Sequence, residues 1–228
     1  MSTADRPVAL VTGATRGIGR AVALDLGATH HVLVGGRGAD AVDALVRELP
    51  SAEPWVADLE HPPYAALPAR LDVLVHSAGV EDGNTVETTS YETWERVFRL
   101  NVFAVAELTR QALPALRAAG GLVVAINSGS GFTASPKSST YAASKFALRA
   151  FTDALREEER GHGVRVSSVH PGRVDTDMQH GLVEKLGEEY DAAYYLAPED
   201  VAAAVRAAVD MPPRGTVETL AVRPTRRR

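Results

Sequence analysis

Short runs of apolar, β-branched residues alternate along this chain with longer segments in which Ala and Leu recur at helical spacing. Several runs are apolar at every position rather than at every second one, which is typical of strands buried on both faces of a parallel sheet. We expect strands at residues 8–11, 32–34, 54–57, 73–75, 122–126, 164–169 and 217–222. We expect helices near residues 16–26, 39–49, 91–118, 138–160 and 198–210.

Alternating strands and helices are typical of right-handed βαβ units, which build a parallel sheet. The pattern therefore predicts an α/β fold of the Rossmann type, a doubly wound, seven-stranded, mainly parallel sheet with helices on both faces. No repeat and no linker divides the chain, so we expect one domain over residues 1–228. Residues 172–198 lack a clear strand and carry three tyrosines, and we expect them to form a lid or loop over the substrate. Residues 225–228 are expected to form a solvated basic tail.

Composition narrows the class of protein. The chain has 24 basic and 29 acidic residues, and this net charge of −5 argues against a nucleic-acid-binding protein. Without cysteine it has neither disulfides nor thiolate metal ligands, and we expect no metal site. The first residues are polar and no apolar run approaches the ~18 residues of a membrane span, so we expect a cytoplasmic protein without signal peptide or membrane partner.

The turn after the first predicted strand is rich in glycine. Gly13, Gly17 and Gly19 lie between that strand and the first helix, within the sequence TGATRGIG. Glycine there lets the backbone turn tightly and lets a pyrophosphate approach the N–H groups of a helix N-terminus. Turns also collect glycine for steric reasons, but the place of this one favours a dinucleotide-binding site.

The charge after the second predicted strand indicates which dinucleotide binds. A site for NAD usually offers a carboxylate to the ribose 2′-hydroxyl at this point. This chain has Arg37 there, and Arg16 lies within the glycine turn. A guanidinium pairs with a phosphate that a carboxylate would repel, so the two arginines favour NADP(H). The alternative is that both are ordinary surface arginines.

Three residues suggest acid–base chemistry. Tyr141 and Lys145 are four residues apart on a predicted helix, which places phenol and ammonium on one face. A cation beside a phenol favours the phenolate, so we expect Lys145 to lower the pKa of Tyr141 towards the working range. Ser128, at the end of the fifth predicted strand, can hold a substrate carbonyl against the phenol. Each feature alone is common on protein surfaces; their combination carries the prediction.

Taken together, these motifs resemble the short-chain dehydrogenase/reductase family, in its single-domain branch. The glycines have that family's Gly-x-x-x-Gly-x-Gly spacing, and Asn101, Ser128, Tyr141 and Lys145 match its catalytic tetrad in order and spacing. The resemblance covers about residues 8–224. It implies that Asn101 holds a water that links Lys145 to solvent, whereas a buried structural asparagine is the alternative.

The resemblance also implies the contacts of the cofactor. Asp58 and Leu59 match a pair that contacts adenine, the Pro171-Gly172 turn lies beside the nicotinamide, and Thr176 contacts its carboxamide. The full set of expected cofactor-binding residues is Gly13, Thr15, Arg16, Gly17, Ile18, Gly19, Arg37, Asp58, Leu59, Ser77, Ala78, Gly79, Tyr141, Lys145, Pro171, Gly172, Val174 and Thr176.

One segment departs from the family's pattern. The family usually has Asn-Asn-Ala-Gly after the fourth strand, where this chain has His76-Ser77-Ala78-Gly79. Ala78 and Gly79 keep the close approach of the backbone to the cofactor, but the paired amides are replaced. His76 can make similar hydrogen bonds, so we expect the cofactor to bind, with its affinity left open.

The expected function is an NADP(H)-dependent oxidoreductase that interconverts a ketone or aldehyde with an alcohol by hydride transfer, with Tyr141 as general acid and base. The family implies a homodimer or homotetramer acting on a small molecule. A non-catalytic dinucleotide sensor or partner protein is one alternative. A sugar-nucleotide epimerase or dehydratase is another, although about 55 residues after Gly172 leave little room for its substrate domain. We expect a moderately apolar pocket lined by Val80, Glu81, Phe132, Met178, Leu182, Tyr190 and Tyr195.

Overall fold

The computed structural model describes residues 6–187 and 189–226. Seven strands form one sheet in the order β3-β2-β1-β4-β5-β6-β7, and every neighbouring pair is parallel. This confirms the Rossmann-type prediction, with a sheet that is wholly rather than mainly parallel. The strands are β1 (Val8–Val11), β2 (His31–Gly36), β3 (Ala52–Val56), β4 (Val73–His76), β5 (Leu122–Ile126), β6 (Arg165–Pro171) and β7 (Thr219–Val222).

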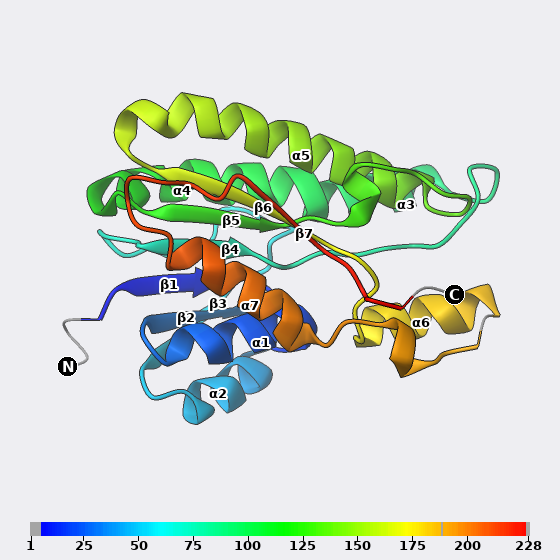
Figure 1. The fold of residues 1–228 in the computed structure, drawn as a ribbon, viewed down its shortest axis with the longest axis horizontal. Coiled ribbons are helices and arrows are strands. Elements are labelled where there is room, and N and C mark those ends of the chain that lie inside the picture. Colours follow the sequence, from blue (N-terminus) through cyan, green and yellow to red (C-terminus); the bar gives the residue numbers. More distant parts are fainter. Residues whose placement is uncertain (1–5, 188, 227–228) are drawn as a thin grey trace.

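Helices cover both faces of the sheet (Figure 1). One face is covered by α1 (Gly17–Gly27), α2 (Ala39–Glu48) and α7 (Pro198–Val209), and the other by α4 (Ala104–Ala119) and α5 (Ser139–Glu159). The short helix α3 (Tyr91–Phe98) precedes α4, and α6 (Asp177–Leu186) lies apart, beyond the carboxyl ends of the strands (Figure 1). None of the described helices is long and apolar enough to cross a membrane.

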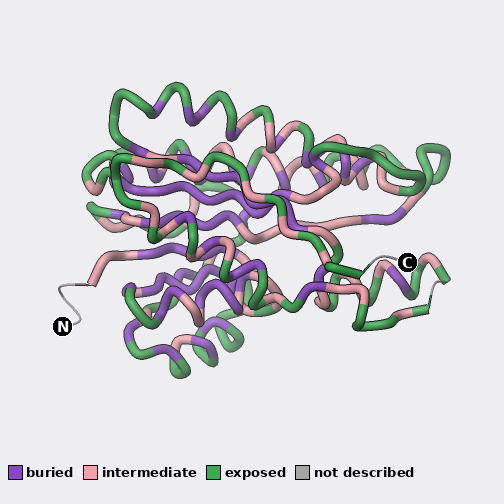
Figure 2. The backbone as a smooth tube through the Cα atoms, in the orientation of Figure 1, coloured by how far each residue is buried: buried purple, intermediate pink, exposed green. Residues whose placement is uncertain are grey.

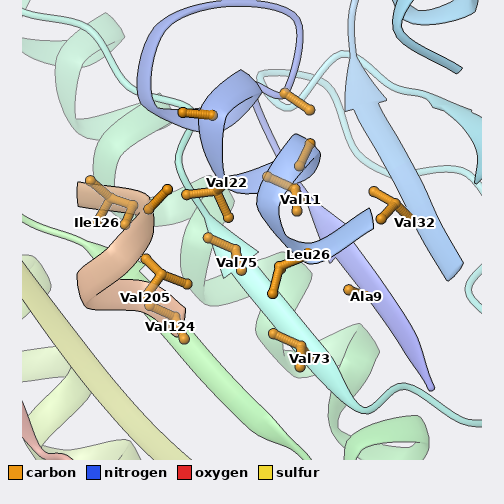
Figure 3. Packing of buried hydrophobic residues seen from close by; sticks show 14 of the residues in the cluster. Ala9, Val11, Val22, Leu26, Val32, Val73, Val75, Val124, Ile126 and Val205 are labelled. Carbon is orange, nitrogen blue, oxygen red and sulfur yellow. The ribbon is translucent and has the colours of Figure 1, made fainter. Parts of the chain in front are cut away.

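Successive residues of each strand point to opposite faces, and so build two apolar cores. Val11 packs with Val22 of α1 and Val205 of α7, whereas its neighbour Leu10 packs on the α4 side. Figure 3 shows the first core, where Val75 of β4 lies among the same side chains. Each of these side chains is fully buried, and burying one contributes roughly 1.5–3 kcal/mol. The strands are therefore buried between the more exposed helices, as Figure 2 shows.

The prediction of a single helix over residues 91–118 is wrong, because the helix is interrupted by a π-helical segment. The chain forms α3, then a π-helical segment at Arg99–Phe103, and then α4. A π-helical turn takes one residue more than an α-helical turn, and such turns often occur at functional sites. This one contains Asn101, which is almost fully buried, and it turns that side chain towards the loop that follows β4.

The predicted lid, residues 172–198, contains α6, a 3₁₀ turn at Ala192–Tyr194 and a short bridge between Val174 and Leu196. The predicted basic tail lies only partly within the described residues, because residues 227–228 fall outside them. Both segments begin at the carboxyl edge of the sheet, where α6 closes one side of the site described next (Figure 1).

Candidate active site

Two adjoining cavities open at the carboxyl ends of the strands. The glycine cleft, about 220 Å³, lies over the Gly13–Gly19 turn, and the tyrosine cavity, about 420 Å³, lies over Ser128 and Tyr141. Thr176 lines both cavities and so marks where they meet. The glycine cleft lies at the point where the strand order reverses, between β1 and β4, which is where open α/β sheets bind their ligands.

The structure brings nearly all the predicted cofactor residues to these cavities. Tyr141, Pro171, Gly172 and Val174 line the tyrosine cavity, and Lys145 lies buried beneath it. The glycine cleft is lined by Gly13, Thr15, Arg16, Gly17, Ile18, Gly19, Arg37, Asp58, Leu59, Ser77, Ala78, Gly79 and Thr176. It is also lined by residues that the sequence did not point to, namely Thr12, Gly35, Gly36, Trp55, Ala57, Glu60, Leu100 and Asp177.

The glycine turn fits a pyrophosphate group. Gly13 has a φ of +62°, and a Cβ added there would lie 2.9 Å from the Cα of Ala78. A Cβ on Gly19 would lie 2.2 Å from the carbonyl oxygen of Gly13, so only glycine allows the turn to fold so tightly. Arg16, at the N-cap position of α1, makes no side-chain capping bond. The N–H groups of the first helical turn are therefore free to bind an anion.

Two arginines extend the positive charge of this cleft. Arg16 forms an ion pair of 3.7 Å with Asp177, the first residue of α6, and both side chains are about three-quarters exposed (73% and 75%). Such an exposed pair contributes little free energy, so the Arg16 guanidinium remains available to a phosphate. Arg37 is exposed at the other end of the cleft, near Asp58. The pKa of Asp58 is lowered chiefly by a hydrogen bond from His61 and slightly by the charge of Arg37.

The reaction centre lies between β5 and α5. Ser128 follows the end of β5, and Tyr141 and Lys145 lie one turn apart on α5. The Lys145 Nζ atom donates a hydrogen bond of 3.0 Å to the carbonyl oxygen of Ile126 and lies 5.5 Å from the centroid of the Tyr141 ring. The Ser128 and Tyr141 side chains line the same cavity, and Ser128 acts on the Tyr141 phenol so as to lower its pKa. The predicted serine and tyrosine therefore line one cavity, and the predicted lysine is buried close to the tyrosine ring.

The pKa of Tyr141 differs from our expectation. Burial raises the pKa of this phenol above its ordinary value, and the negative charge of Glu81 raises it further, while the side chain of Ser128 lowers it. Burial also lowers the pKa of Lys145 to about 8, which Glu81 opposes. We expected Lys145 to lower the pKa of Tyr141, but its ammonium faces a backbone carbonyl, and burial decides the direction.

Asn101 uses its whole amide inside the protein. Its Nδ2 atom donates to the Val80 carbonyl oxygen (2.9 Å) and to the Ser144 hydroxyl (3.0 Å). Its Oδ1 atom accepts from the Val80 N–H at 2.9 Å. The side chain thus fixes the loop after β4 against α5, which is the structural role that we gave as the alternative. The role of Asn101 in a water relay stays a prediction.

Two residues whose roles sequence reasoning missed hold Ser128 in place. The Oδ1 atom of Asn127 accepts from the Ser128 N–H, and the Nδ1 atom of His170 donates to the Ser128 carbonyl oxygen, both at 2.9 Å. The other ring nitrogen of His170 accepts from Ser168, also at 2.9 Å. In the sequence, Asn127 and His170 are polar residues at the ends of apolar strands, and a buried polar residue in such a place needs a hydrogen-bond partner.

Hydrogen bonds hold the His76-Ser77 segment, where the sequence departs from the Asn-Asn pattern of the family. His76 is buried, and its Nε2 atom lies 2.9 Å from the hydroxyl of Thr109 on α4. Burial lowers the pKa of His76 to about 3, so the ring is neutral. The N–H groups of Ser77 and Ala78 donate to the Thr12 hydroxyl at 3.1 and 3.3 Å. The edge of the glycine cleft therefore keeps its shape without the paired asparagines.

Comparison with known proteins identifies the family. The model of the short chain dehydrogenase family matches residues 7–187. A glycine betaine reductase of Emericella nidulans is 33% identical over an alignment of 236 positions that covers 95% of this chain but 18% of that protein. Dehydrogenase/reductase SDR family member 11 of Bos taurus is 32% identical over an alignment of 245 positions that covers 96% of each chain.

A solved structure of actinorhodin polyketide ketoreductase with NADPH superimposes with a TM-score of 0.89, at 29% identity and with 98% of both chains covered. The matched family region contains the glycine turn, Ser128, Tyr141 and Lys145. The family model covers the chain from the glycine turn to the end of α6, and the similar proteins cover nearly all of it. This chain therefore belongs to the short-chain dehydrogenase family of oxidoreductases.

Proposed function

We propose that this protein is an NADP(H)-dependent oxidoreductase that interconverts a ketone or aldehyde with an alcohol, with Tyr141 as general acid and base. The observation that carries the proposal is the junction of the two cavities at Thr176, which joins an anion-binding glycine turn to the Ser128–Tyr141 pair. The exposed Arg16 and Arg37 guanidinium groups favour the 2′-phosphate of NADP(H) over NAD. A solved relative that carries NADPH supports the same cofactor.

A bound nicotinamide supplies the hydride that adds to the carbonyl carbon. Ser128 donates a hydrogen bond to the carbonyl oxygen and so holds it beside the phenol. As negative charge develops on that oxygen, Tyr141 gives it the phenolic proton, and the oxygen becomes the alcohol hydroxyl. The ammonium of Lys145, 5.5 Å from the ring, stabilises the phenolate that remains. Because burial raises the pKa of Tyr141, the phenol is protonated at neutral pH, as reduction requires.

The substrate is a small carbonyl compound. The tyrosine cavity is lined by apolar Met178 and Leu182 from α6 on one side and by polar Ser128 and Tyr141 on the other. Its volume of about 420 Å³ suits a ligand with an apolar body and one polar reacting group.

A homodimer or homotetramer, paired through α4 and α5, is part of the proposal. Phe103 and Phe146 lie at these two helices with 58% and 42% of their surface exposed. Large exposed aromatic side chains on neighbouring helices are typical of interfaces between subunits. Light scattering after size-exclusion chromatography tests this, and a single species at the monomer mass of 24.2 kDa would contradict it.

The decisive experiment replaces the general acid. In Tyr141→Phe, we expect NADPH-dependent reduction of a panel of ketones and aldehydes to fall by roughly 10²–10⁴-fold, because the proton donor is lost. NADPH binding, measured by its fluorescence, should stay within about twofold, since the phosphate-binding turn is untouched. Tyr91→Phe is the matched control, because Tyr91 is 78% exposed and lines neither cavity.

The same experiment separates the non-catalytic alternative. A dinucleotide sensor on this fold binds NADPH but consumes none with any carbonyl compound. Substantial turnover in Tyr141→Phe would overturn the assignment of the acid, and absence of turnover in the parent protein would overturn the enzymatic proposal.

A further inference from the structure

The tyrosine cavity holds a carboxyl group that the proposed mechanism leaves without a role. Glu81 lines this cavity together with Ser128 and Tyr141. It is half-buried, and among the described residues its carboxyl has neither a hydrogen-bond donor nor an ion-pair partner. A carboxyl group that lines a reaction centre without taking part in its structural hydrogen bonds is a candidate for a role in that centre.

The loop that carries Glu81 is held on the side of α5. The Asn101 amide binds both the N–H and the carbonyl of Val80, each at 2.9 Å. Gly79 packs so closely that an added Cβ would lie 3.2 Å from Asn101 Oδ1 and 4.0 Å from Lys145 Nζ. The backbone on the N-terminal side of Glu81 is thus fixed against the reaction centre.

The same loop is held on the side of α6. Lys185 donates a hydrogen bond to the Asp82 carbonyl oxygen, and a Cβ on Gly83 would lie 2.7 Å from a methyl group of Leu182. With both flanks anchored, Glu81 has little freedom to leave the tyrosine cavity. This also gives Lys185 a structural role.

The charges around Glu81 come from three directions. Helix α5 presents Tyr141 and Lys145, and the loop itself presents Asp82, whose two carboxylate oxygens are buried without a partner. The rim of the cavity carries the exposed cations Lys137 and Arg173. Burial raises the pKa of Glu81 to about 7, Asp82 adds to this, and Lys145 opposes it.

We propose that Glu81 is a positioning residue of the reaction centre. The hydrogen bonds of Asn101 to Val80 and of Lys185 to Asp82 hold its loop at the tyrosine cavity, where its carboxyl charge acts on Tyr141 and Lys145. The inference deepens the proposed function and rests on it. The ionised carboxylate favours the protonated phenol and ammonium, which are the forms that carbonyl reduction needs. Loss of this charge makes both groups release their protons at lower pH.

The first test needs no turnover. Carboxyl carbons of isotopically labelled glutamate are followed by NMR as the pH is raised. One resonance, absent in Glu81→Gln and present in the exposed control Glu87→Gln, should titrate near pH 7. In Lys145→Met its midpoint should rise by about half a pH unit or more, because an opposing cation is gone. A midpoint near the ordinary value of 4.5 would contradict the electrostatic coupling between Glu81 and Lys145, and so would a midpoint that is the same in the parent and in Lys145→Met.

The second test is the pH profile of kcat for carbonyl reduction. In Glu81→Gln, the alkaline limb should move to lower pH by about one unit, because a negative charge that raises both proton affinities is lost. Glu81→Asp, which keeps a carboxyl, should recover at least half of this shift, and Glu87→Gln should match the parent. A Glu81→Gln limb identical to that of the parent would overturn the proposal. If the parent reduces no carbonyl compound, the proposed function fails, while the NMR titration still decides the coupling.

Discussion

The glycine cleft and the tyrosine cavity adjoin, but they are built by different means. The glycine cleft is made of backbone, since added Cβ atoms on Gly13 or Gly19 would lie within 3 Å of other main-chain atoms. The tyrosine cavity is made of side chains whose burial changes their proton affinity, as it does for Tyr141 and Lys145. In the first region the shape of the backbone decides how closely a ligand can approach, whereas in the second the balance of burial and charge decides what reacts.

The largest effect is expected where the backbone leaves no room. In Gly19→Ala the new Cβ would lie 2.2 Å from the Gly13 carbonyl oxygen, so the glycine turn must move. We expect the Kd for NADPH to rise by roughly 100-fold or more, since such overpacking costs about 3 kcal/mol. Fluorescence titration measures the affinity, and circular dichroism reports whether the fold persists.

Gly38→Ala is the matched control for that substitution. Nothing lies within 4 Å of a Cβ added at Gly38, which also lies next to the cleft residue Arg37. The Kd of Gly38→Ala for NADPH should stay within about twofold of the parental Kd. If Gly19→Ala also kept the parental Kd, the cleft would not be defined by its backbone.

The next effect concerns His76, the last residue of β4, which immediately precedes the cleft residue Ser77. Burial holds its pKa near 3 in the folded protein, against an ordinary value of 6.5. Below pH 6.5 the unfolded chain therefore binds a proton that the folded protein refuses, so stability falls as the pH drops. The loss is about 1.4 kcal/mol per pH unit, or about 2 kcal/mol on reaching about pH 5.

Urea unfolding at several pH values measures this loss. His76→Asn removes the titrating ring. Between the pKa of His76 in the folded protein, about 3, and its ordinary pKa of 6.5, the free energy of unfolding should therefore depend less on pH in this variant than in the parent. Equal slopes for the parent and His76→Asn would show that burial of this ring is not what makes the protein sensitive to acid.

The smallest effect is expected for a side chain at the open end of the glycine cleft. Arg37→Ala should raise the Kd for NADPH by about tenfold, the value of one charge-assisted hydrogen bond, and leave the Kd for NADH unchanged. Arg47→Ala, at an exposed arginine of α2, is the control. An equal change for both dinucleotides would mean that Arg37 does not recognise the 2′-phosphate.

The strands in the middle of the sheet were the easiest part to predict. Both β1 and β5 begin and end at the residues that the apolar runs indicated, because strands buried on both faces are apolar throughout. The edge was less clear, since β7 begins at Thr219 and its residues are only half-buried or exposed. The π-helical turn at Arg99–Phe103 left no mark in the spacing, because tertiary contacts, rather than periodicity, hold Asn101 there.

The sequence by itself determined the Rossmann-type fold, the glycine turn and the pairing of Tyr141 with Lys145, because these depend on neighbours within one turn, strand or helix. The tertiary structure alone decided what surrounds that pair. Asn101 reaches back 21 residues to Val80, and Lys185 reaches 103 residues to Asp82, and together they hold Glu81 in the cavity. Burial and charge at Tyr141 are sums over such distant contacts, so the direction of its pKa shift followed from the fold and not from the spacing of its motif.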